Sequence, residues 1–194
     1  MRKFFLIAGF ALLLFPLTAF GQSTPKVELF GGYSYLRADG DGDPASNLHG
    51  WNASIAGNVN HWLGLVADFS GHYGSETVTV GSARGNVDGR FHSFLFGPRV
   101  SARKNDKVTP FFHALFGASH AKANGTFTSG ASTINVSDSD SAFAMALGGG
   151  MDVKLSDAVA VRLIQADYLM TRFGGSTQNN ARLSFGLVLR LGKK

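Results

Sequence analysis

The sequence predicts an all-β protein, folded as an eight-stranded antiparallel up-and-down β-barrel. Apolar and polar residues alternate with a period of two in eight segments, and the connections between these segments alternate between long and short. The chain is also rich in phenylalanine and glycine, with 17 and 25 of 194 residues, which is typical of strands joined by many turns. Beyond the N-terminal segment, no stretch shows a helical period.

The first 21 residues are expected to form a secretory signal peptide. Arg2 and Lys3 precede an apolar run, and the small residues Ala19 and Gly21 stand before the expected cleavage site. The apolar run is shorter than the roughly 20 residues that a spanning helix needs, so an uncleaved anchor is the weaker alternative.

The barrel domain is then expected to span residues 22–194. Of the 18 basic side chains, 16 remain after Arg2 and Lys3 are removed, against 13 acidic ones. This excess is small and scattered, so no nucleic-acid partner is expected. The absence of cysteine excludes a disulfide scaffold and cysteine-ligated metal sites.

The alternating segments are expected to be the strands. Their ranges are 26–36, 50–60, 62–73, 90–101, 109–121, 141–153, 158–170 and 181–191. Segments of this length can cross a bilayer when they are tilted.

The connections predict which ends of the strands lie together. The long connections, rich in Gly, Ser, Thr, Asn and Asp, begin at Arg37, Gly74, Lys122 and Thr171. The short ones lie at His61, at 102–108 and at 154–157. Long and short connections therefore fall at opposite ends of a meander, as in a bacterial outer-membrane barrel.

The two faces of the strands differ in a way that predicts a transmembrane barrel. The apolar side chains, such as the odd positions of 183–191, are too many and too large for eight strands to enclose, so we expect them to face lipid. The opposite face is small and polar, which predicts a filled lumen with a charge network. Its expected members are Glu28, Asp68, Arg99, His113, Asp152, Asp167, Arg182 and Arg190, with Arg99 and Arg190 neutralising the carboxylates.

The segment 158–170 is ambiguous because its charged residues do not share one parity. We expect Gln165 and Asp167 to face inward, Tyr168 to face outward, and Arg162 to reach the interface at the short-connection end by snorkelling, although a bulge would change this assignment. Aromatic girdles are expected from Trp62 at the short-connection end and, at the long-connection end, from Tyr33, Tyr35, Trp51, Tyr73, Tyr168 and Phe173.

Short motifs add a family resemblance. Residues 30–35 (FGGYSY), 96–99 (FGPR), 165–168 (QADY) and the C-terminal strand resemble the outer-membrane β-barrel family typified by the transmembrane part of outer-membrane protein A. The resemblance implies a place in the bacterial outer membrane, contact with outer-membrane lipid and lipopolysaccharide, and insertion by the barrel-assembly machinery. No peptidoglycan-binding domain follows the barrel, so cell-wall tethering is not implied. The chain ends in Lys193-Lys194 where the family commonly has an aromatic residue.

The expected function is a structural or surface-interaction role, through four long extracellular loops that bind an unknown ligand. A narrow small-solute pore is the main alternative. A soluble carrier of lipocalin shape would require the opposite assignment of faces.

A lipid-modifying envelope enzyme is a less favoured alternative than the pore, and no catalytic residue, cofactor or metal is expected. Asp68, Ser70 and His72 share one strand face, but neighbours at i and i+2 stand roughly 7 Å apart and cannot form a triad alone. The acidic stretch 39–43 resembles a calcium loop, but Pro44 stands where the sharp turn needs glycine.

Overall fold

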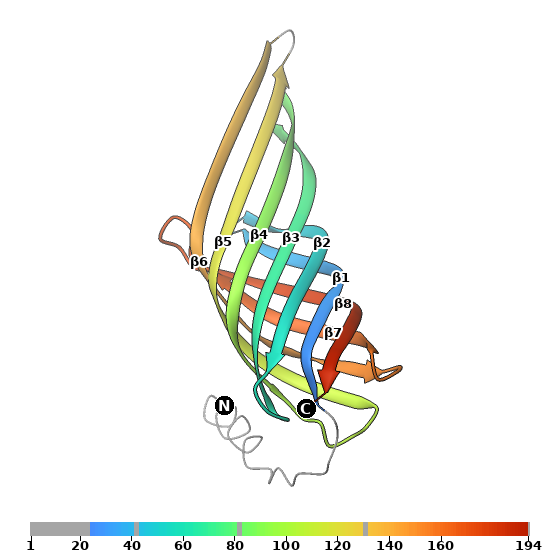
Figure 1. The fold of residues 1–194 in the computed structure, drawn as a ribbon. Coiled ribbons are helices and arrows are strands. Elements are labelled where there is room, and N and C mark those ends of the chain that lie inside the picture. Colours follow the sequence, from blue (N-terminus) through green and yellow to red (C-terminus); the bar gives the residue numbers. More distant parts are fainter. Residues whose placement is uncertain (1–23, 41–42, 81–82, 130–131, 194) are drawn as a thin grey trace, which may run out of the picture.

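The computed structural model describes residues 24–40, 43–80, 83–129 and 132–193, so the expected signal peptide lies outside the described residues. The regular elements in them are antiparallel strands that pair in sequence order and close into a barrel, as predicted (Figure 1). The strands are β1 (Pro25–Gly40), β2 (Asp43–Asn58), β3 (Leu63–Val80), β4 (Ala83–Ser101), β5 (Val108–Ser129), β6 (Ser132–Lys154), β7 (Val159–Thr171) and β8 (Gln178–Lys193). None of the described residues forms a helix long and apolar enough to span a membrane.

The first and last strands close the barrel against each other. Leu29 pairs with Leu189 and Tyr33 with Phe185, so the apolar rows of β1 and β8 are continuous on one face. Glu28 pairs with Arg190 on the other face. The backbone groups along this seam are therefore paired, which the interior of a bilayer requires.

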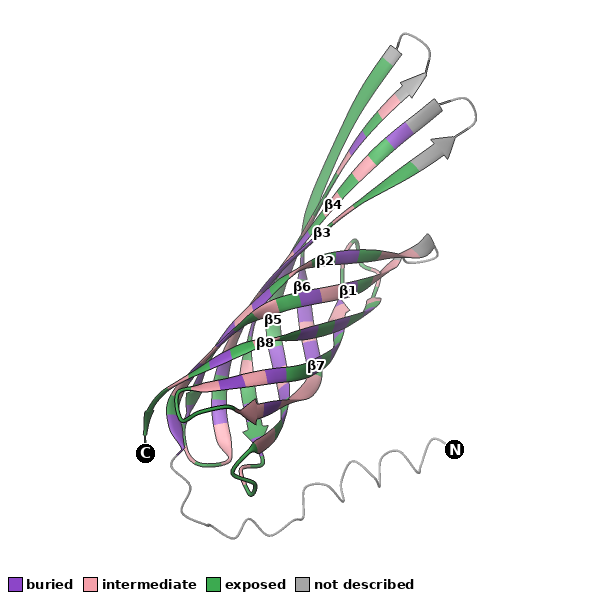
Figure 2. Ribbon diagram, turned by 90° about the vertical axis from the view of Figure 1, so that its right-hand side faces the viewer, coloured by how far each residue is buried: buried purple, intermediate pink, exposed green. Residues whose placement is uncertain are grey.

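The predicted assignment of faces is confirmed by solvent exposure (Figure 2). Phe143 and Leu187, which represent the apolar face, are 52% and 56% exposed, whereas Asp68 and Arg182 are buried. An exposed apolar face and a buried polar face are the reverse of a soluble barrel.

The long connections differ from the prediction, because most of them are strands. Residues 74–80 continue β3, 83–89 continue β4, and 122–129 and 132–140 continue β5 and β6. The result is a four-stranded sheet that rises beyond the rim of the barrel (Figure 1). Of the four expected loops, the β7–β8 connection is a turn, with Gly174 and Gly175 at positive φ.

The lumen also contains apolar layers that the alternation did not predict. Several fully buried side chains, from four different strands, form a cluster near the rim and middle of the barrel: Leu36, Leu95, Leu115 and Leu169. Phe173 packs against this cluster beside Phe91, with ring centroids 6.3 Å apart. Its expected place in an aromatic girdle is therefore wrong, because its ring lies over the mouth of the barrel.

Candidate functional site

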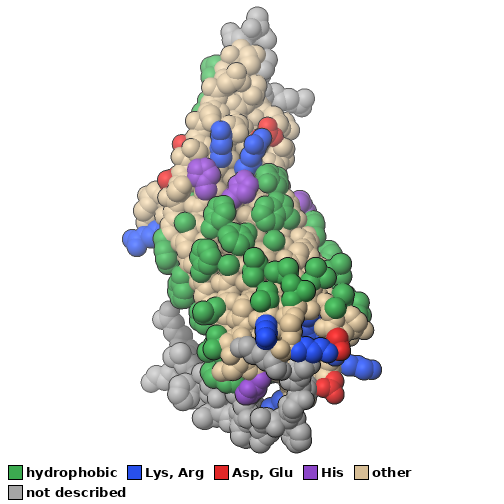
Figure 3. All heavy atoms as spheres, in the orientation of Figure 1, with side chains coloured by type: hydrophobic (Ala, Val, Ile, Leu, Met, Phe, Trp, Pro, Cys, Tyr) green, Lys and Arg blue, Asp and Glu red, His purple; other side chains and the backbone are tan. Residues whose placement is uncertain are grey.

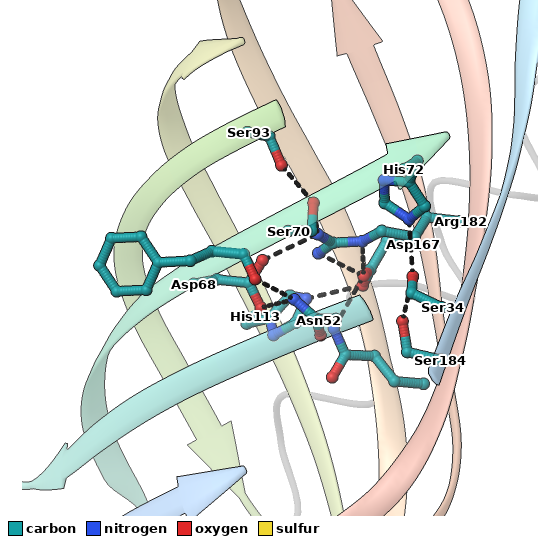
Figure 4. A network of polar contacts seen from close by, with 12 residues as sticks. Ser34, Asn52, Asp68, Ser70, His72, Ser93, His113, Asp167, Arg182 and Ser184 are labelled. Carbon is teal, nitrogen blue, oxygen red and sulfur yellow. Dashed lines mark hydrogen bonds and ion pairs between the residues drawn. The ribbon is translucent and has the colours of Figure 1, made fainter. Parts of the chain in front are cut away.

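The centre of the barrel interior holds a fully buried arginine, Arg182 of β8, between two carboxylates (Figure 4). Its Nε and Nη2 donate to Asp167 Oδ2 of β7 over 2.9 and 2.7 Å, and its Nη1 donates to Asp68 Oδ1 of β3 over 2.8 Å. Nη1 also lies 3.2 Å from Ser70 Oγ. Arg182 thus connects β3 to β7 through the lumen and compensates two buried charges.

Three further side chains, none of them an arginine, complete the polar contacts of these carboxylates. His113 Nε2 of β5 lies 2.7 Å from Asp167 Oδ1, and Gln165 donates to Asp167 Oδ2 over 2.8 Å. Asn52 of β2 donates to Asp68 Oδ2 over 3.0 Å. Each carboxylate therefore accepts hydrogen bonds from more than one strand.

The glycines of β6 leave room for the buried side chains around them. A Cβ at Gly148 would lie 2.2 Å from Asp167 Oδ1, and one at Gly150 would lie 2.8 Å from the ring of Phe111. Both distances are far shorter than a van der Waals contact, so any larger residue would displace its neighbour.

Arg162 of β7 faces the lumen, so the prediction that it snorkels outward is wrong. The register between β7 and β8 shifts between Arg162 and Gln165, where Leu163 and Ile164 together oppose one residue of β8. This bulge leaves Leu163 and Ile164 both exposed and turns Arg162 inward, where it is 2% exposed.

Inside the barrel, Arg162 is paired and stacked. Its Nε and Nη2 donate to the two oxygens of Asp152 over 2.8 and 3.1 Å, and its Nη1 donates to Gln165 Oε1 over 2.6 Å. The guanidinium lies between the rings of Phe30 and Phe111, 4.2 and 4.3 Å from their centroids. Arg162 is therefore held by a fork-like ion pair and by cation–π contacts.

A second cluster lies at the short-connection end, around Glu28 of β1. Arg99 contacts Glu28 Oε2, Arg103 Nη2 donates to Oε1 over 3.0 Å, and Arg190 Nε lies 3.9 Å from Oε1. Asn58 Oδ1 accepts from Arg99 and Arg103 over 3.3 and 3.4 Å. Three arginines thus converge on one carboxylate.

The eight residues expected in the lumen network all face the interior, but they form two clusters: one contains Glu28, Arg99 and Arg190, and Gln165 and Arg162 connect the remaining five in the other. Among the carboxylates, Arg99 and Arg190 contact only Glu28. Arg162 contacts Asp152, and Arg182 contacts Asp68 and Asp167. The sequence did not predict that Arg103 contacts Glu28, because Arg103 lies in a turn, where alternation does not indicate which way a side chain points. It misplaced Arg162 because a bulge reverses parity.

The arrangement of Asp68, Ser70 and His72 does not form a catalytic triad within the described residues. Asp68 is engaged by an arginine and an asparagine, and Ser70 Oγ lies 2.6 Å from Ser93 Oγ. His72 Nε2 instead lies 2.8 Å from Ser34 Oγ, and its buried Nδ1 has no partner among the described residues. No acid orients this imidazole as a general base would need. No acidic, histidine or cysteine cluster suited to a metal ion occurs in the described part of the chain, which lacks residues 41–42 of the acidic stretch.

At the short-connection end, an exposed ion cluster joins the ends of β6 and β8 to the β6–β7 turn. Lys154 Nζ lies 2.6 Å from Asp157 Oδ1, and Lys193 Nζ lies 3.1 Å from Asp157 Oδ2. Hydrogen bonds from Lys154 and Lys193 lower the pKa of Asp157 to about 2. The Asp157 carboxylate therefore remains charged at any physiological pH.

The tyrosines of the long-connection end form an outward row. Tyr33, Tyr73 and Tyr168 are 40–46% exposed. Their hydroxyls, and that of Tyr35, bond to polar side chains on neighbouring strands: His49, His92, Asn179 and Asn47. Rings beside apolar side chains with hydroxyls toward polar ones are typical of a membrane interface.

The protruding sheet has two edges without a neighbouring strand in the described structure. The pairing of β2 with β3 ends at His49 and Tyr73, and the pairing of β6 with β7 ends at Ala144 and Thr171. Within the described residues, 74–80 of β3 and 134–142 of β6 therefore pair with a strand on one side only.

A closed antiparallel barrel with an apolar exterior, an interfacial tyrosine row and a charged, plugged interior defines the class of integral outer-membrane β-barrel proteins. Comparison places the chain within that class: a model of the family described as "Outer membrane protein beta-barrel domain" matches residues 7–190. The chain belongs to this family and is a protein of the bacterial outer membrane.

Solved structures agree with the fold. Ail, the attachment invasion locus protein of Yersinia pestis, is similar with a TM-score of 0.57 and 22% identity over 85% of this chain and 99% of that one. Neisserial surface protein A is similar with a TM-score of 0.52 and 11% identity over 88% and 100% of the two chains. A search of curated proteins found no match.

Proposed function

We propose that the protein is a surface-interaction protein that displays the β3–β6 sheet outside the cell and binds an extended polypeptide along the edge of β6. The observation that carries this proposal is the run 134–142, which pairs with β5 on one side and with no strand on the other among the described residues. Unpaired N–H and C=O groups along an edge are a template for an added strand.

The composition of this edge supports strand addition. Natural edges are commonly blunted by lysine, proline or short length, but residues 134–142 contain neither lysine nor proline and extend roughly 30 Å. Asp138 and Asp140 are exposed near the rim. An acidic edge favours a basic polypeptide, so this is the partner we propose.

The sheet also offers contacts for the partner's side chains. On the face that looks over the barrel mouth, Ile134 and Val136 of β6 are 64% and 52% exposed. Phe127 of β5 pairs with Ile134 and lies on the same face. An added strand could therefore place alternate apolar side chains beside this row.

A pore is less well supported than a surface role. The lumen contains apolar layers and ion clusters, and the cavity lined by Glu28, Asp152 and Arg190 is about 10 Å³, room for about one water molecule. We also propose no catalytic role, since no acid orients His72, which lies in the lumen beside Ser34.

The proposal can be tested with a shortened hairpin. Residues 125–136 are replaced by Asn-Gly, which joins the directly paired Asn124 and Ser137 through a two-residue turn. The purified protein and this variant, each immobilised in detergent, are used to select from a displayed library of linear peptides. We expect the full-length protein to enrich peptides that alternate apolar and basic residues, and the variant to enrich none of them.

A matched control replaces residues 78–85 of the β3–β4 hairpin by Asn-Gly, which removes a similar tip but leaves β6 intact. This control should still bind the selected peptides. In a peptide added as a strand, every second backbone N–H faces β6. N-methylation of the nitrogens that face β6 should abolish binding, whereas N-methylation of the nitrogens that face away should not. Peptides that bind all three proteins equally would refute strand addition at β6.

A further inference from the structure

We propose that the outer face of the β3–β6 wall, just beyond the apolar band, binds the phosphate of a phosphorylated sugar lipid in the outer leaflet. The site consists of Arg90 and Lys122, with His92 and His120 beneath them. The proposal rests on the orientation proposed above, in which the protruding sheet lies outside the cell.

The register brings these side chains together on one face. Arg90 of β4 pairs directly with Lys122 of β5, and His92 pairs with His120 one step nearer the barrel. Phe94 pairs with Ala118 a further step down the same face. Figure 3 shows Lys or Arg side chains and histidines gathered immediately beyond a band of hydrophobic side chains on this side of the molecule.

The two cations face each other without a carboxylate between them. Like charges directly opposite on an antiparallel pair are about 4.5–5.5 Å apart at Cβ and destabilise the sheet. In the lumen each arginine contacts a carboxylate, but neither Arg90 nor Lys122 forms an ion pair or side-chain hydrogen bond within the described part of the chain. A bound anion would remove this repulsion.

The height of the pair above the apolar band matches a lipid headgroup. Arg90 lies four residues beyond Phe94, the outermost phenylalanine of β4 on that face. At about 3.3 Å per residue and a tilt of about 40°, the cations stand roughly 10 Å farther along the membrane normal. Headgroup phosphates occupy the polar layer just outside the hydrocarbon core.

A groove beside Arg90 offers space for a sugar. It has a volume of about 500 Å³, and its lining includes Tyr73, Ser75, Asp88 and Arg90. Asp88 accepts hydrogen bonds from Ser75 and Asn86, which fix its orientation. A carboxylate next to a cation suits a ligand that carries hydroxyl donors as well as a phosphate, so a phosphorylated sugar fits better than a phosphate alone.

The histidines are held in place for a supporting role. His92 Nε2 lies 3.1 Å from the Tyr73 hydroxyl, and the two rings meet edge to face at a centroid distance of 5.6 Å. His120 Nδ1 lies 2.8 Å from Ser141 Oγ of β6. Each imidazole thus uses one ring nitrogen within the sheet and stands next to the cations.

The test measures binding of diphosphoryl lipid A to the purified protein in octyl glucoside micelles by calorimetry. We expect the double variant R90Q/K122Q to bind about tenfold or more weakly than the unmodified protein, because two charge-assisted contacts are lost. The variant R37Q/R172Q, which removes two other exposed cations near the same rim, should bind as the unmodified protein does. The exchange variant R90K/K122R, which keeps both charges, should retain most of the affinity.

Heat-modifiable migration on a gel verifies that each variant is folded. Equal affinity of R90Q/K122Q and the unmodified protein would overturn the proposal, as would equally tight binding of dephosphorylated lipid A. Displacement of lipid A by an equal concentration of inorganic phosphate would assign the site to free phosphate instead of a lipid. A detergent micelle does not separate an extracellular from a periplasmic compartment, so the measured affinity does not depend on the orientation of the protein in the cell.

Discussion

Arg182 shows how single residues specify the interior of this barrel. Its charge is acceptable in the lumen because Asp68 and Asp167 both compensate it, and their charges are in turn acceptable because of Arg182. Alternation along β8 correctly predicted that Arg182 faces inward, and the same reasoning placed Asp68 and Asp167. It could not predict which charges pair, because pairing across a lumen depends on register and tilt.

Removal of Arg182 should therefore be costly. We expect Arg182→Met to lower the free energy of unfolding by about 3–5 kcal/mol, because it leaves two buried carboxylates without their cation. Urea unfolding in detergent micelles, followed by tryptophan fluorescence, measures this change. Arg37→Met, at an exposed position, is the control, and a loss of under about 1 kcal/mol in Arg182→Met would show that the network is dispensable.

Substitution of Arg162 tests how much the stacking of its guanidinium between Phe30 and Phe111 contributes to stability. Arg162→Lys keeps the charge but loses the two-point contact with Asp152 and the planar stacking on Phe30 and Phe111, so we expect a loss of about 1–3 kcal/mol. The same urea unfolding experiment applies, with exposed Arg172→Lys as the control. Equal stability of Arg162→Lys and the unmodified protein would refute a role for guanidinium geometry.

At the scale of elements, the sequence predicted the strands of the barrel much better than those of the protruding sheet. Within the barrel, one face is buried and the other exposed, so a period of two is visible. Above the rim both faces meet water, and runs such as 75–80 (SETVTV) and 133–137 (TINVS) resemble polar loops. Their β-branched residues and their cross-strand pairs, such as Thr126 with Asn135, nevertheless favour strands.

The β5–β6 tip should be separable from the barrel. Its described residues form their strand pairs with each other and with the β3–β4 hairpin, and not with the strands that close the barrel, so replacing residues 125–136 by Asn-Gly should change the free energy of unfolding by less than about 1 kcal/mol. Urea unfolding and heat-modifiable migration provide the measurement. A barrel that fails to fold, or that loses several kcal/mol, would mean that the tip is part of the folding unit.

At the scale of the whole molecule, we propose that the barrel supports the protruding sheet and that the sheet binds partners. The lumen combines ion clusters with apolar layers under Phe173, so we expect no unitary conductance steps in planar bilayers. A sixteen-stranded porin in the same bilayers is the positive control. Reproducible conductance steps that change in Arg99→Gln or Asp68→Asn would favour the pore alternative.

The orientation of the sheet is the central claim, and cysteine labelling tests it most directly. The chain contains no cysteine, so Ser137→Cys on the protruding part of β6 and Asp106→Cys in the β4–β5 turn each provide a single reactive site. A membrane-impermeant maleimide is added to intact cells and to cells with a permeabilised outer membrane. We predict that Ser137→Cys is labelled in intact cells and Asp106→Cys only after permeabilisation; the reverse pattern would contradict the proposal that this sheet faces the outside.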